Sequence, residues 1–280
     1  GSGKLSLNLS NLGFPDKKLQ TFKKWIGQPY GMIIISGPTG SGKSTTLYAA
    51  LQEIHSEGIN ITTVEDPVEY QLAGINQVQM HDEIGLNFSA SLRSILRQDP
   101  DVLLIGEIRD EETANIAVKF SMTGHLVFST VHANDATSTI LRLLDLGIPP
   151  FLLGSSLNLV MAQRLVRTID KDYNEVYNPT KEELDLIDFP KSKIKSTKFH
   201  RGIPHRSNHN TGYKGRTAIH EIMEVDSTIK KLIFDGADQT DIKAAAMKNG
   251  MTPLRDAGIE KIINGTSSID EIIRATVEDI

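Results

Sequence analysis

The 280-residue sequence predicts an α/β fold, in which a mainly parallel sheet is covered by helices on both faces and followed by a small helical subdomain. Three observations support this prediction. Apolar strand-like runs alternate with helical patterns over the first two-thirds of the chain, a glycine-rich segment joins one such run to a helix, and helix boundary signals return near the C-terminus. Because parallel strands need long crossover connections, the alternation indicates a parallel sheet.

Four short apolar runs are predicted to be buried strands, at Met32–Ser36, Ile61–Val64, Val102–Ile105 and Leu126–Thr130. Helical patterns are predicted at Ser44–His55, Phe88–Arg97, Glu111–Ser121, Ala136–Leu146 and Phe151–Arg164. In the third of these helices, an apolar stripe follows an acidic first turn, as is typical of a helix that packs on a sheet.

The last third of the chain changes character twice. From Thr168 to about Thr211 the sequence is rich in Lys, Asp, Asn, Pro and His, which predicts an irregular insert. Helical signals then return: Thr252-Pro253 is a helix start, Gly265 follows a helix end, and Ser268 to Glu271 has the spacing of a capping box. We therefore predict a small helical subdomain over Ser227–Ile280.

The composition is ordinary for a globular protein, with 39% hydrophobic and 23% charged residues. The sequence has no apolar run long enough to cross a membrane and no signal peptide pattern, so we expect no direct membrane insertion. It contains no cysteine, which excludes disulfides, thiolate metal sites and cysteine nucleophiles. The net charge of −5 argues against a surface that coats nucleic acid.

The segment GPTGSGKST matches the pattern G-x-x-x-x-G-K-[ST] between a predicted strand and a predicted helix. Its glycines let the backbone turn tightly, so that N–H groups converge on phosphates at a helix N-terminus. Lys43 is expected to neutralise the β- and γ-phosphates, and Ser44 to place its hydroxyl on Mg²⁺. The predicted nucleotide-binding residues are Gly37, Pro38, Thr39, Gly40, Ser41, Gly42, Lys43, Ser44 and Thr45.

Carboxylates follow two other predicted strands. Glu107 comes directly after Val102–Ile105, which is the arrangement of a Walker B acid near the metal and its water, although Asp is the usual residue there. Glu65, Asp66 and Glu69 follow the strand at Ile61–Val64, and clustered acids at a strand exit often mark a metal or water site. The sequence has no N-K-x-D motif that reads guanine, so ATP is preferred to GTP.

Two histidines bracket the strand at Leu126–Thr130. His132 follows the carboxyl end of that strand, where open α/β sheets bind ligands, so we expect it to sense the γ-phosphate. For His125 a structural hydrogen-bonding role and a catalytic role stay equally open.

These segments, in this order, resemble the GspE/PilB family of secretion and pilus-assembly ATPases. The similar stretches are GPTGSGKSTTLYA, TVEDPVEY, LRQDPDVLLIGEIRD, TGHLVFSTVHAN, AQRLVRT and GYKGRTAIHE. The resemblance implies a RecA-like fold and a homo-hexameric ring that hydrolyses ATP. It also implies a cytoplasmic motor, peripheral to the inner membrane, that moves an inner-membrane platform protein.

The resemblance assigns roles to single residues. Glu69 is expected to be the catalytic base, Glu107 the acid that orients Mg²⁺ through water, and His132 the nucleotide sensor. Which of Glu69 and Glu107 accepts the proton stays open, because this depends on geometry. Arg93, Arg97 and Arg109 fall in the same motifs and are expected to reach phosphates, acids or a neighbouring subunit.

The chain departs from the family pattern in its insert. Many members bind zinc there through two C-x-x-C pairs, and the aligned positions in this chain are Asp170, Tyr173, His205 and Asn208. Because Tyr and Asn are poor zinc ligands, zinc is not expected. The three histidines of the insert, His200, His205 and His209, are more simply explained as part of a solvated loop.

The resemblance also divides the chain. We interpret residues 1–13 as a cloning scar, Gly1–Gly3, and a remnant of the linker from missing N-terminal domains. Residues 14–167 are expected to form the RecA-like domain, 168–213 the insert and 214–280 the helical subdomain. Two other functions compete with the secretion or pilus motor: a RecA-like ATPase that translocates nucleic acid, and a non-enzymatic nucleotide-gated scaffold.

Overall fold

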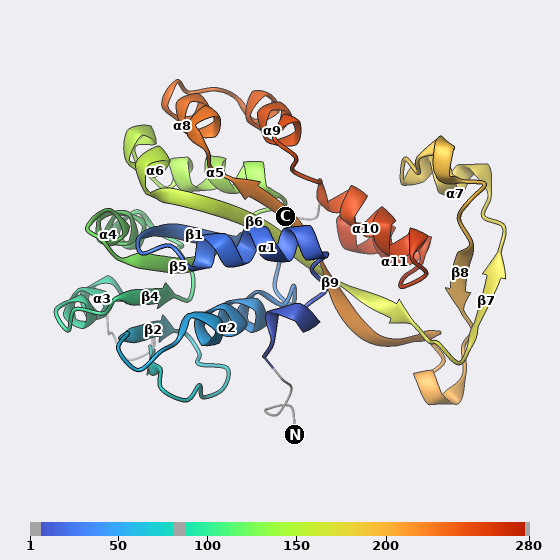
Figure 1. The fold of residues 1–280 in the computed structure, drawn as a ribbon, viewed down its shortest axis with the longest axis horizontal. Coiled ribbons are helices and arrows are strands. Elements are labelled where there is room, and N and C mark those ends of the chain that lie inside the picture. The colour runs from blue at the N-terminus through green and yellow to red at the C-terminus, as the bar shows by residue number, and fades with distance from the viewer. Residues whose placement is uncertain (1–6, 81–87, 278–280) are drawn as a thin grey trace.

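The computed structural model describes residues 7–80 and 88–277 (Figure 1). Part of the predicted linker remnant, residues 1–6, lies outside the described residues. The rest of that remnant forms the short 3-10 helix η2 (Leu9–Asn11), and the side chain of Leu9 is fully buried in the core. Helix α1 (Asp16–Ile26), which no sequence signal had indicated, follows it and buries Leu19, Phe22 and Ile26.

The centre of the molecule is a seven-stranded sheet with the order β3-β2-β4-β5-β1-β6-β9. The first six of these strands run parallel and only β9 runs antiparallel to its neighbour. The strands are β1 (Gly31–Ser36), β2 (Ile61–Glu65), β3 (Asn76–Gln79), β4 (Val102–Ile105), β5 (Leu126–Val131), β6 (Leu157–Ile169) and β9 (Tyr213–Glu224). The predicted mainly parallel sheet is therefore present, with the four predicted strands at its centre.

Alternate residues of the central strand β1 face two different cores. Met32 and Ile34 pack with helices α3 to α6, whereas Ile33 and Ile35 pack with α1 and α2 on the other face. The covering helices are α2 (Lys43–Ile54), α3 (Phe88–Leu96), α4 (Glu111–Met122), α5 (Ala136–Asp145) and α6 (Pro150–Ser156). Since both faces of the sheet are covered, the carboxyl edge of its strands is the exposed place for a site.

The predicted helix over Phe151–Arg164 is wrong. Helix α6 ends at Ser156, and the rest of this stretch begins strand β6. Its side chains are buried on both faces of the sheet between β1 and β9, so the strand shows no alternation between apolar and polar residues. A continuous apolar run of this kind cannot be distinguished from a buried helix by periodicity.

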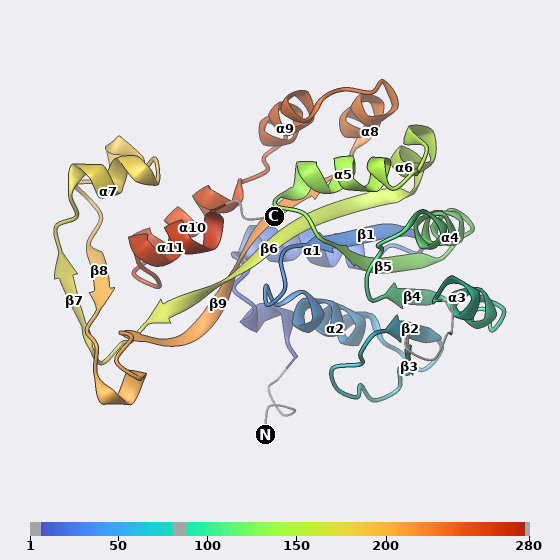
Figure 2. The same ribbon diagram turned by 180° about the vertical axis from the view of Figure 1, so that it is seen from behind.

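The insert is more regular than predicted. It forms an arm (residues 170–212) built from a hairpin of β7 (Asn174–Tyr177) and β8 (Phe199–Gly202), helix α7 (Lys181–Leu186) and the 3-10 helices η4 (Lys191–Lys193) and η5 (Arg206–Asn208). Figures 1 and 2 show this arm projecting from the body at the far end of β6 and β9. A separate core of Ile187, Phe189 and Phe199 with β6, β9 and α11 attaches it.

The C-terminal helices are α8 (Ser227–Phe234), α9 (Gln239–Lys248), α10 (Leu254–Ile263) and α11 (Ile269–Thr276), over the stretch predicted to be helical. Only half of the predicted capping box forms. The hydroxyl of Ser268 accepts from the backbone N–H of Glu271, but the Glu271 carboxylate turns away to Arg167 and Arg274. Among the described residues, no helix is long and apolar enough to cross a membrane.

Candidate functional site

The phosphate-binding loop, residues 37–42, connects the carboxyl end of β1 to the first turn of α2. Strands β2 and β4 end at the same edge, and beside the loop their exits line a cavity of about 480 Å³. Ser44, Glu65, Glu69 and Glu107 all contribute to its wall. Thus the structure brings together the predicted hydroxyl ligand and the predicted acids, which the sequence separates by up to 63 positions.

The loop conformation requires glycine. Gly37, Gly40 and Gly42 have φ values of 155°, 82° and 84°, in a region that residues with a Cβ rarely adopt. A Cβ on Gly42 would lie 2.9 Å from Nε2 of Gln163, so space as well as conformation excludes a side chain there. Helix α2 begins at Lys43, and its first backbone N–H groups have no partner within the helix, which leaves them available to an anion.

Lys43 folds back over the loop that it follows. Its Nζ donates a hydrogen bond of 2.5 Å to the carbonyl of Gly37. Burial lowers the pKa of Lys43, the nearby charge of Arg164 lowers it further, and Glu107 opposes both effects. The lysine therefore carries its positive charge in a partly desolvated position, where a phosphate group would stabilise that charge.

Gln163 and Arg164 on β6 support the loop, and sequence reasoning did not assign them to the site. The Gln163 side chain is 1% exposed, donates to the Ser41 carbonyl at 2.9 Å and accepts from the Thr46 hydroxyl at 2.8 Å. Arg164 donates to the carbonyl of Gln163 at 2.9 Å and to that of Asn134 at 2.6 Å. The available signal was the pair of polar residues inside an otherwise apolar run, MAQRLV.

The three acids at the end of β2 and just after it have different surroundings. Glu65 is buried and accepts hydrogen bonds from the Tyr48 hydroxyl and, at 2.6 Å, from Thr63. Burial and the Glu65 carboxylate raise the pKa of Tyr48, so its hydroxyl stays protonated and donating. The Tyr48 oxygen also accepts from the backbone N–H of Glu69 at 3.2 Å. Glu65 therefore anchors this segment, while Asp66 and Glu69 are exposed.

Glu107 lies between two nitrogen-bearing side chains. Its carboxylate accepts from Nε of Arg109 at 2.5 Å, and Nε2 of His132 lies 3.7 Å from its other oxygen. The backbone around it is fixed because Gly106 donates to Val64 at 2.8 Å and accepts from the Thr130 hydroxyl at 2.6 Å. The structure thus groups Glu107, Arg109 and His132 at the ends of β4 and β5.

His125 lies away from this site. It precedes β5, at the opposite edge of the sheet from the phosphate-binding loop, where its ring stacks on Phe120 with 3.9 Å between centroids. Its Nδ1 is 3.1 Å from the Phe120 carbonyl, and its Nε2 is 3.5 Å from a carboxylate oxygen of Asp99. These contacts favour the structural role for His125.

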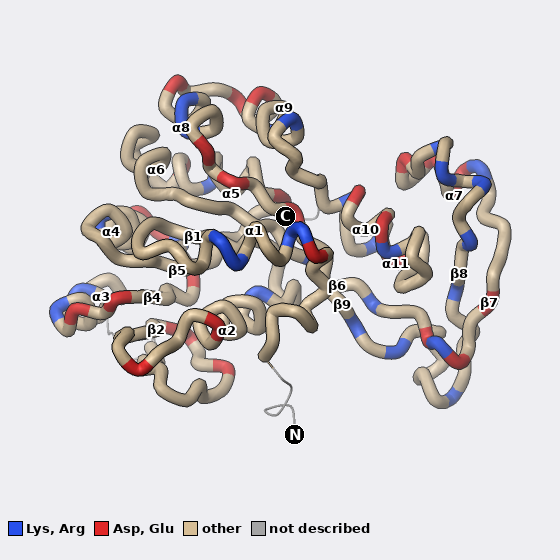
Figure 3. Tube along the Cα trace, in the orientation of Figure 1, with Lys and Arg blue, Asp and Glu red and all other residues tan. Residues whose placement is uncertain are grey.

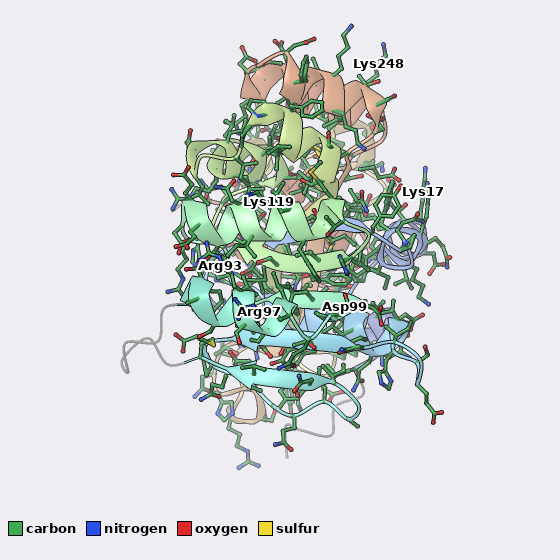
Figure 4. The ribbon with its side chains drawn as sticks, turned by 90° about the vertical axis from the view of Figure 1, so that its left-hand side faces the viewer. Lys17, Arg93, Arg97, Asp99, Lys119 and Lys248 are labelled. Carbon is green, nitrogen blue, oxygen red and sulfur yellow. The ribbon has the colours of Figure 1, made fainter. Side chains whose placement is uncertain are left out.

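Arg93 of helix α3 and Arg97, which follows the end of that helix, are exposed. Figure 4 shows Arg93 and Arg97 on the side of the molecule opposite the arm. Arg93 forms an ion pair of 2.6 Å with Glu112 on α4. Two of the three arginines that the resemblance singles out, Arg93 and Arg109, are therefore already paired with acids of this chain.

The four positions aligned with zinc ligands lie together at the base of the arm. Asn208 donates to the Asp170 carboxylate at 2.9 Å, and the rings of Tyr173 and His205 stack with 3.7 Å between centroids. Asn208 also accepts from the backbone N–H groups of His205 and Gly212. A hydrogen bond from the Asp172 backbone, and then the one from Asn208, lower the pKa of Asp170. Hydrogen bonds and ring stacking therefore occupy the place of a metal centre.

The cavity beside the loop has the donor chemistry that Mg²⁺ prefers. Hydroxyl and carboxylate oxygens line it, and Mg²⁺ is commonly held by one or two such groups together with substrate phosphates and water. The described residues contain no cluster of three or more His, Asp or Glu side chains that could hold a metal by themselves. This arrangement fits an ion that arrives with a nucleotide.

A family model and the sequences of similar proteins both point to the same protein family. The model of the family described as "Type II/IV secretion system protein" matches residues 2–274. The type IV pilus assembly ATPase PilB of Myxococcus xanthus is 48% identical over 277 residues, which are 98% of this chain and 49% of that protein. The type II secretion system ATPase E of Vibrio cholerae is 46% identical over 273 residues, 97% of this chain and 54% of that protein.

The fold has a solved counterpart. The crystal structure of the pilus retraction motor PilT with bound ADP superposes with a TM-score of 0.72 at 26% identity, covering 97% of this chain and 67% of that one. The predicted RecA-like fold class is thereby confirmed. The chain spans about half the length of the two curated relatives. From the family match and these identities, the chain belongs to the type II/IV secretion system protein family.

Proposed function

We propose that this chain is the Mg²⁺-dependent ATPase domain of a motor that powers type II secretion or type IV pilus assembly. The observation that carries the proposal is the shared cavity, in which Ser44 at the start of α2 faces Glu69 and Glu107 from two neighbouring strands. Curated relatives with 46–48% identity are named as ATPases of these two systems, which supports the same assignment.

Phosphate binding in this proposal uses groups of the loop and of α2. The free N–H groups at the start of α2 and the Lys43 ammonium converge where the phosphates of ATP would lie. Lys43 exchanges its hydrogen bond to the Gly37 carbonyl for one to a phosphate oxygen. The hydroxyl of Ser44 and, through water, the carboxylate of Glu107 would hold Mg²⁺. When bound, Mg²⁺ offsets the negative charge that develops on the phosphate oxygens.

Glu107 and Glu69 are proposed to position the attacking water and to accept its proton, respectively. Glu107 already accepts from Arg109 and lies 3.7 Å from His132, so its carboxylate is oriented by neighbours and suited to hold a water molecule in place. Glu69 is exposed in the same cavity, with its backbone fixed by Tyr48. We assign proton acceptance to Glu69, because its carboxylate has no described side-chain partner that competes for the proton.

His132 is proposed to report the state of the site to the rest of the chain. It follows β5 and precedes Asn134, whose carbonyl accepts from Arg164 of β6. A change at the γ-phosphate that moves His132 would therefore act on the same strand that supports the phosphate-binding loop. The division of the chain at residues 167 and 213 is also part of this proposal. Strand β6 runs across the first boundary, and strand β9 begins at the second.

The assembly is proposed from the family. A homo-hexamer, completed by N-terminal domains and acting on an inner-membrane platform protein from the cytoplasmic side, is the arrangement that the resemblance implies. The function does not require nucleic acid.

The proposal is tested by phosphate release from ATP with and without Mg²⁺. We expect release to need Mg²⁺, and Lys43→Ala to weaken ATP binding at least tenfold, because the lysine neutralises phosphate charge in the bound state. The control is Lys119→Ala, an exposed lysine of α4, which covers the face of the sheet opposite to α2. Equal ATP affinity for wild type and Lys43→Ala would show that the loop is not the nucleotide site.

A further inference from the structure

Glu221 of strand β9 is a buried carboxylate that holds the first residues of two helices. It is 1% exposed. One of its oxygens accepts from the backbone N–H of Ala136, where α5 begins, at 2.8 Å, and the other accepts from that of Leu254, where α10 begins, at 3.0 Å. We call these two hydrogen bonds the helix bridge. Figure 3 shows β9 running from the base of the arm into the body, where α5 and α10 lie beside it.

Charge as well as hydrogen bonding stabilises the helix bridge. The N-terminus of a helix carries about half a positive charge, so two of them offset much of the charge of one carboxylate. In residues 7–80 and 88–277, no lysine or arginine forms an ion pair with Glu221. Burial raises the pKa of Glu221 and Asp135 adds to the rise, whereas the two backbone hydrogen bonds and Lys243 lower it. The helix ends are therefore the main partners of this buried carboxylate.

Helix α10 depends on the helix bridge because its own cap residue gives no support. That residue is Pro253, whose side chain forms no capping hydrogen bond, whereas α8, α9 and α11 each begin with an Asp or Ser side chain that does. Leu254 also belongs to the separate core that attaches the arm, together with Phe189 and Phe199. The first turn of α10 thus joins Glu221 to the C-terminal helices and to the base of the arm.

The other end of the helix bridge adjoins the nucleotide site. Ala136 follows His132 by four positions, and His132 lies 3.7 Å from the carboxylate of Glu107. Between them, the carbonyl of Asn134 accepts from Arg164 at 2.6 Å. Strand β6 therefore holds this short segment at Asn134 and strand β9 holds it at Ala136. A displacement of His132 acts directly on the helix bridge.

We propose that Glu221 is a positioning residue that couples the segment carrying His132 to helix α10. When bound nucleotide orders this segment, the Ala136 end of the bridge is fixed and the carboxylate is held against Leu254. Coupling between two sites is reciprocal and is typically about 5–150-fold, so α10 in turn stabilises the segment in the position that hydrolysis needs. The inference rests on the proposed function, because it takes the phosphate-binding loop as the nucleotide site.

The test is hydrogen exchange of the whole chain, with and without Mg²⁺ and a non-hydrolysable ATP analogue, read by mass spectrometry at the first turn of α10. The variant is Glu221→Gln, which has nearly the same volume but only one acceptor oxygen, so a single end of the bridge can form. The matched control is Glu271→Gln, because Glu271 is also 1% exposed but attaches α11 to β6. Affinity for the analogue, phosphate release from ATP and thermal midpoints are measured for each protein.

We expect the analogue to slow exchange at the first turn of α10 by about fivefold or more in wild type and in Glu271→Gln. Glu221→Gln should bind the analogue within about threefold of the wild-type affinity, but its α10 should no longer respond. Its rate of phosphate release should fall by about tenfold or more, because His132 is no longer held in place. If Glu221→Gln does not fold, Glu221→Asp replaces it, since the shorter side chain keeps the charge but cannot reach both N–H groups.

Three outcomes overturn the inference although the analogue binds. These are no response of α10 in wild type, a response that persists in the Glu221 variant, and an equal loss of response in the Glu221 and Glu271 variants, which would indicate general loosening of the C-terminal helices. Binding of the analogue and a response of α10 without any phosphate release would contradict only the proposed hydrolysis. If wild type binds no analogue, the proposed function fails and the coupling fails with it.

Discussion

Gln163 contacts both the phosphate-binding loop and the first turns of helix α2, although it lies outside every nucleotide-binding motif of the sequence. Its amide bridges the Ser41 carbonyl and the Thr46 hydroxyl from the neighbouring strand β6. Both partners are buried, so loss of the amide leaves polar atoms without hydrogen bonds, at about 1–3 kcal/mol each. The conformation of the loop therefore depends on a residue more than a hundred positions away.

We predict that Gln163→Met weakens ATP binding at least fivefold. The rate at which the bound ATP is hydrolysed should change by a smaller factor. Methionine fills the same space but cannot donate or accept these hydrogen bonds. Titration with a fluorescent ATP analogue measures the affinity, and Met161→Leu, two residues earlier on the same buried face, is the control. An affinity equal to wild type would mean that the loop holds its shape without Gln163.

The sequence predicts those residues of the candidate site that lie just after the ends of strands. The predicted site residues Lys43, Ser44, Glu69 and Glu107 all come after buried strands. Because the carboxyl ends of parallel strands lie at one edge of the sheet, their positions in the sequence predict that they lie close together. The sequence pattern could not show that Arg109 pairs with Glu107. Nor could it show that the Tyr48 hydroxyl forms hydrogen bonds with both the Glu65 carboxylate and the backbone N–H of Glu69. Such contacts depend on side-chain directions that only the assembled sheet fixes.

Strand β6 is the element that sequence patterns described least well. It is buried between β1 and β9 in its first half and leaves the body with β9 in its second half, so it shows neither alternation nor a helical stripe. By contrast, β4 agrees with its predicted bounds. Strands β1, β2 and β5 and helices α3 to α5 differ from theirs by one residue at one end, and α2 differs by one residue at each end. Their turns and caps give clear boundaries, which β6 lacks.

Helix α11 is attached to β6 through one buried carboxylate. Glu271 accepts from the guanidinium groups of Arg167 and Arg274 and from the backbone of Arg167. Burial by itself raises the pKa of Glu271, but these hydrogen bonds outweigh it and lower the pKa to about 2. The folded pKa is thus below the unfolded value of 4.5, so the stabilisation is complete above pH 4.5 and is lost as the pH falls toward 2.

We therefore predict that Glu271→Gln lowers the free energy of unfolding by roughly 1–3 kcal/mol at pH 7, after allowance for the partly exposed arginines. At about pH 3 the difference between wild type and variant should fall to less than half, because wild type has by then lost most of the charge-dependent term. Urea titrations at both pH values measure it. A difference that stays constant with pH would contradict an ionic attachment of α11.

The arm is predicted to fold without zinc. Asp170 and Asn208 form a hydrogen-bonded pair, and Tyr173 and His205 stack, at the four positions where the family resemblance would place zinc ligands. Because no thiolate is present, metal binding cannot supply folding energy there in the usual way. We expect a chelator to leave the thermal midpoint unchanged, and elemental analysis to find no stoichiometric zinc. One tightly bound zinc per chain would show that the prediction is wrong.

At the scale of the whole molecule, this chain is proposed to bind nucleotide well but to hydrolyse it slowly. Phosphoryl transfer needs positive charge against the γ-phosphate beyond the loop lysine, and such arginines are worth roughly 10³–10⁵-fold in rate. Arg93 and Arg109 already pair with Glu112 and Glu107. We expect the additional charge to come from the N-terminal domain of a neighbouring subunit.

A form extended at its N-terminus should therefore assemble further and turn over ATP at least tenfold faster than the 280-residue chain, with similar ATP affinity. Light scattering after size-exclusion chromatography gives the mass of each form, and phosphate release gives the rate. If the short form is monomeric and hydrolyses ATP as fast as the long form, arginines of this chain are sufficient.

The central claim is that the acids across the cavity from the phosphate-binding loop carry out ATP hydrolysis. Its most direct test is to measure ATP binding and phosphate release in the same preparation of Glu107→Gln and of wild type. Glutamine keeps the shape and an oxygen but removes the charge, so we predict unchanged ATP binding and a rate lower by ~10²-fold or more. Equal rates of hydrolysis for the two proteins would remove Glu107 from the mechanism and contradict the proposed site.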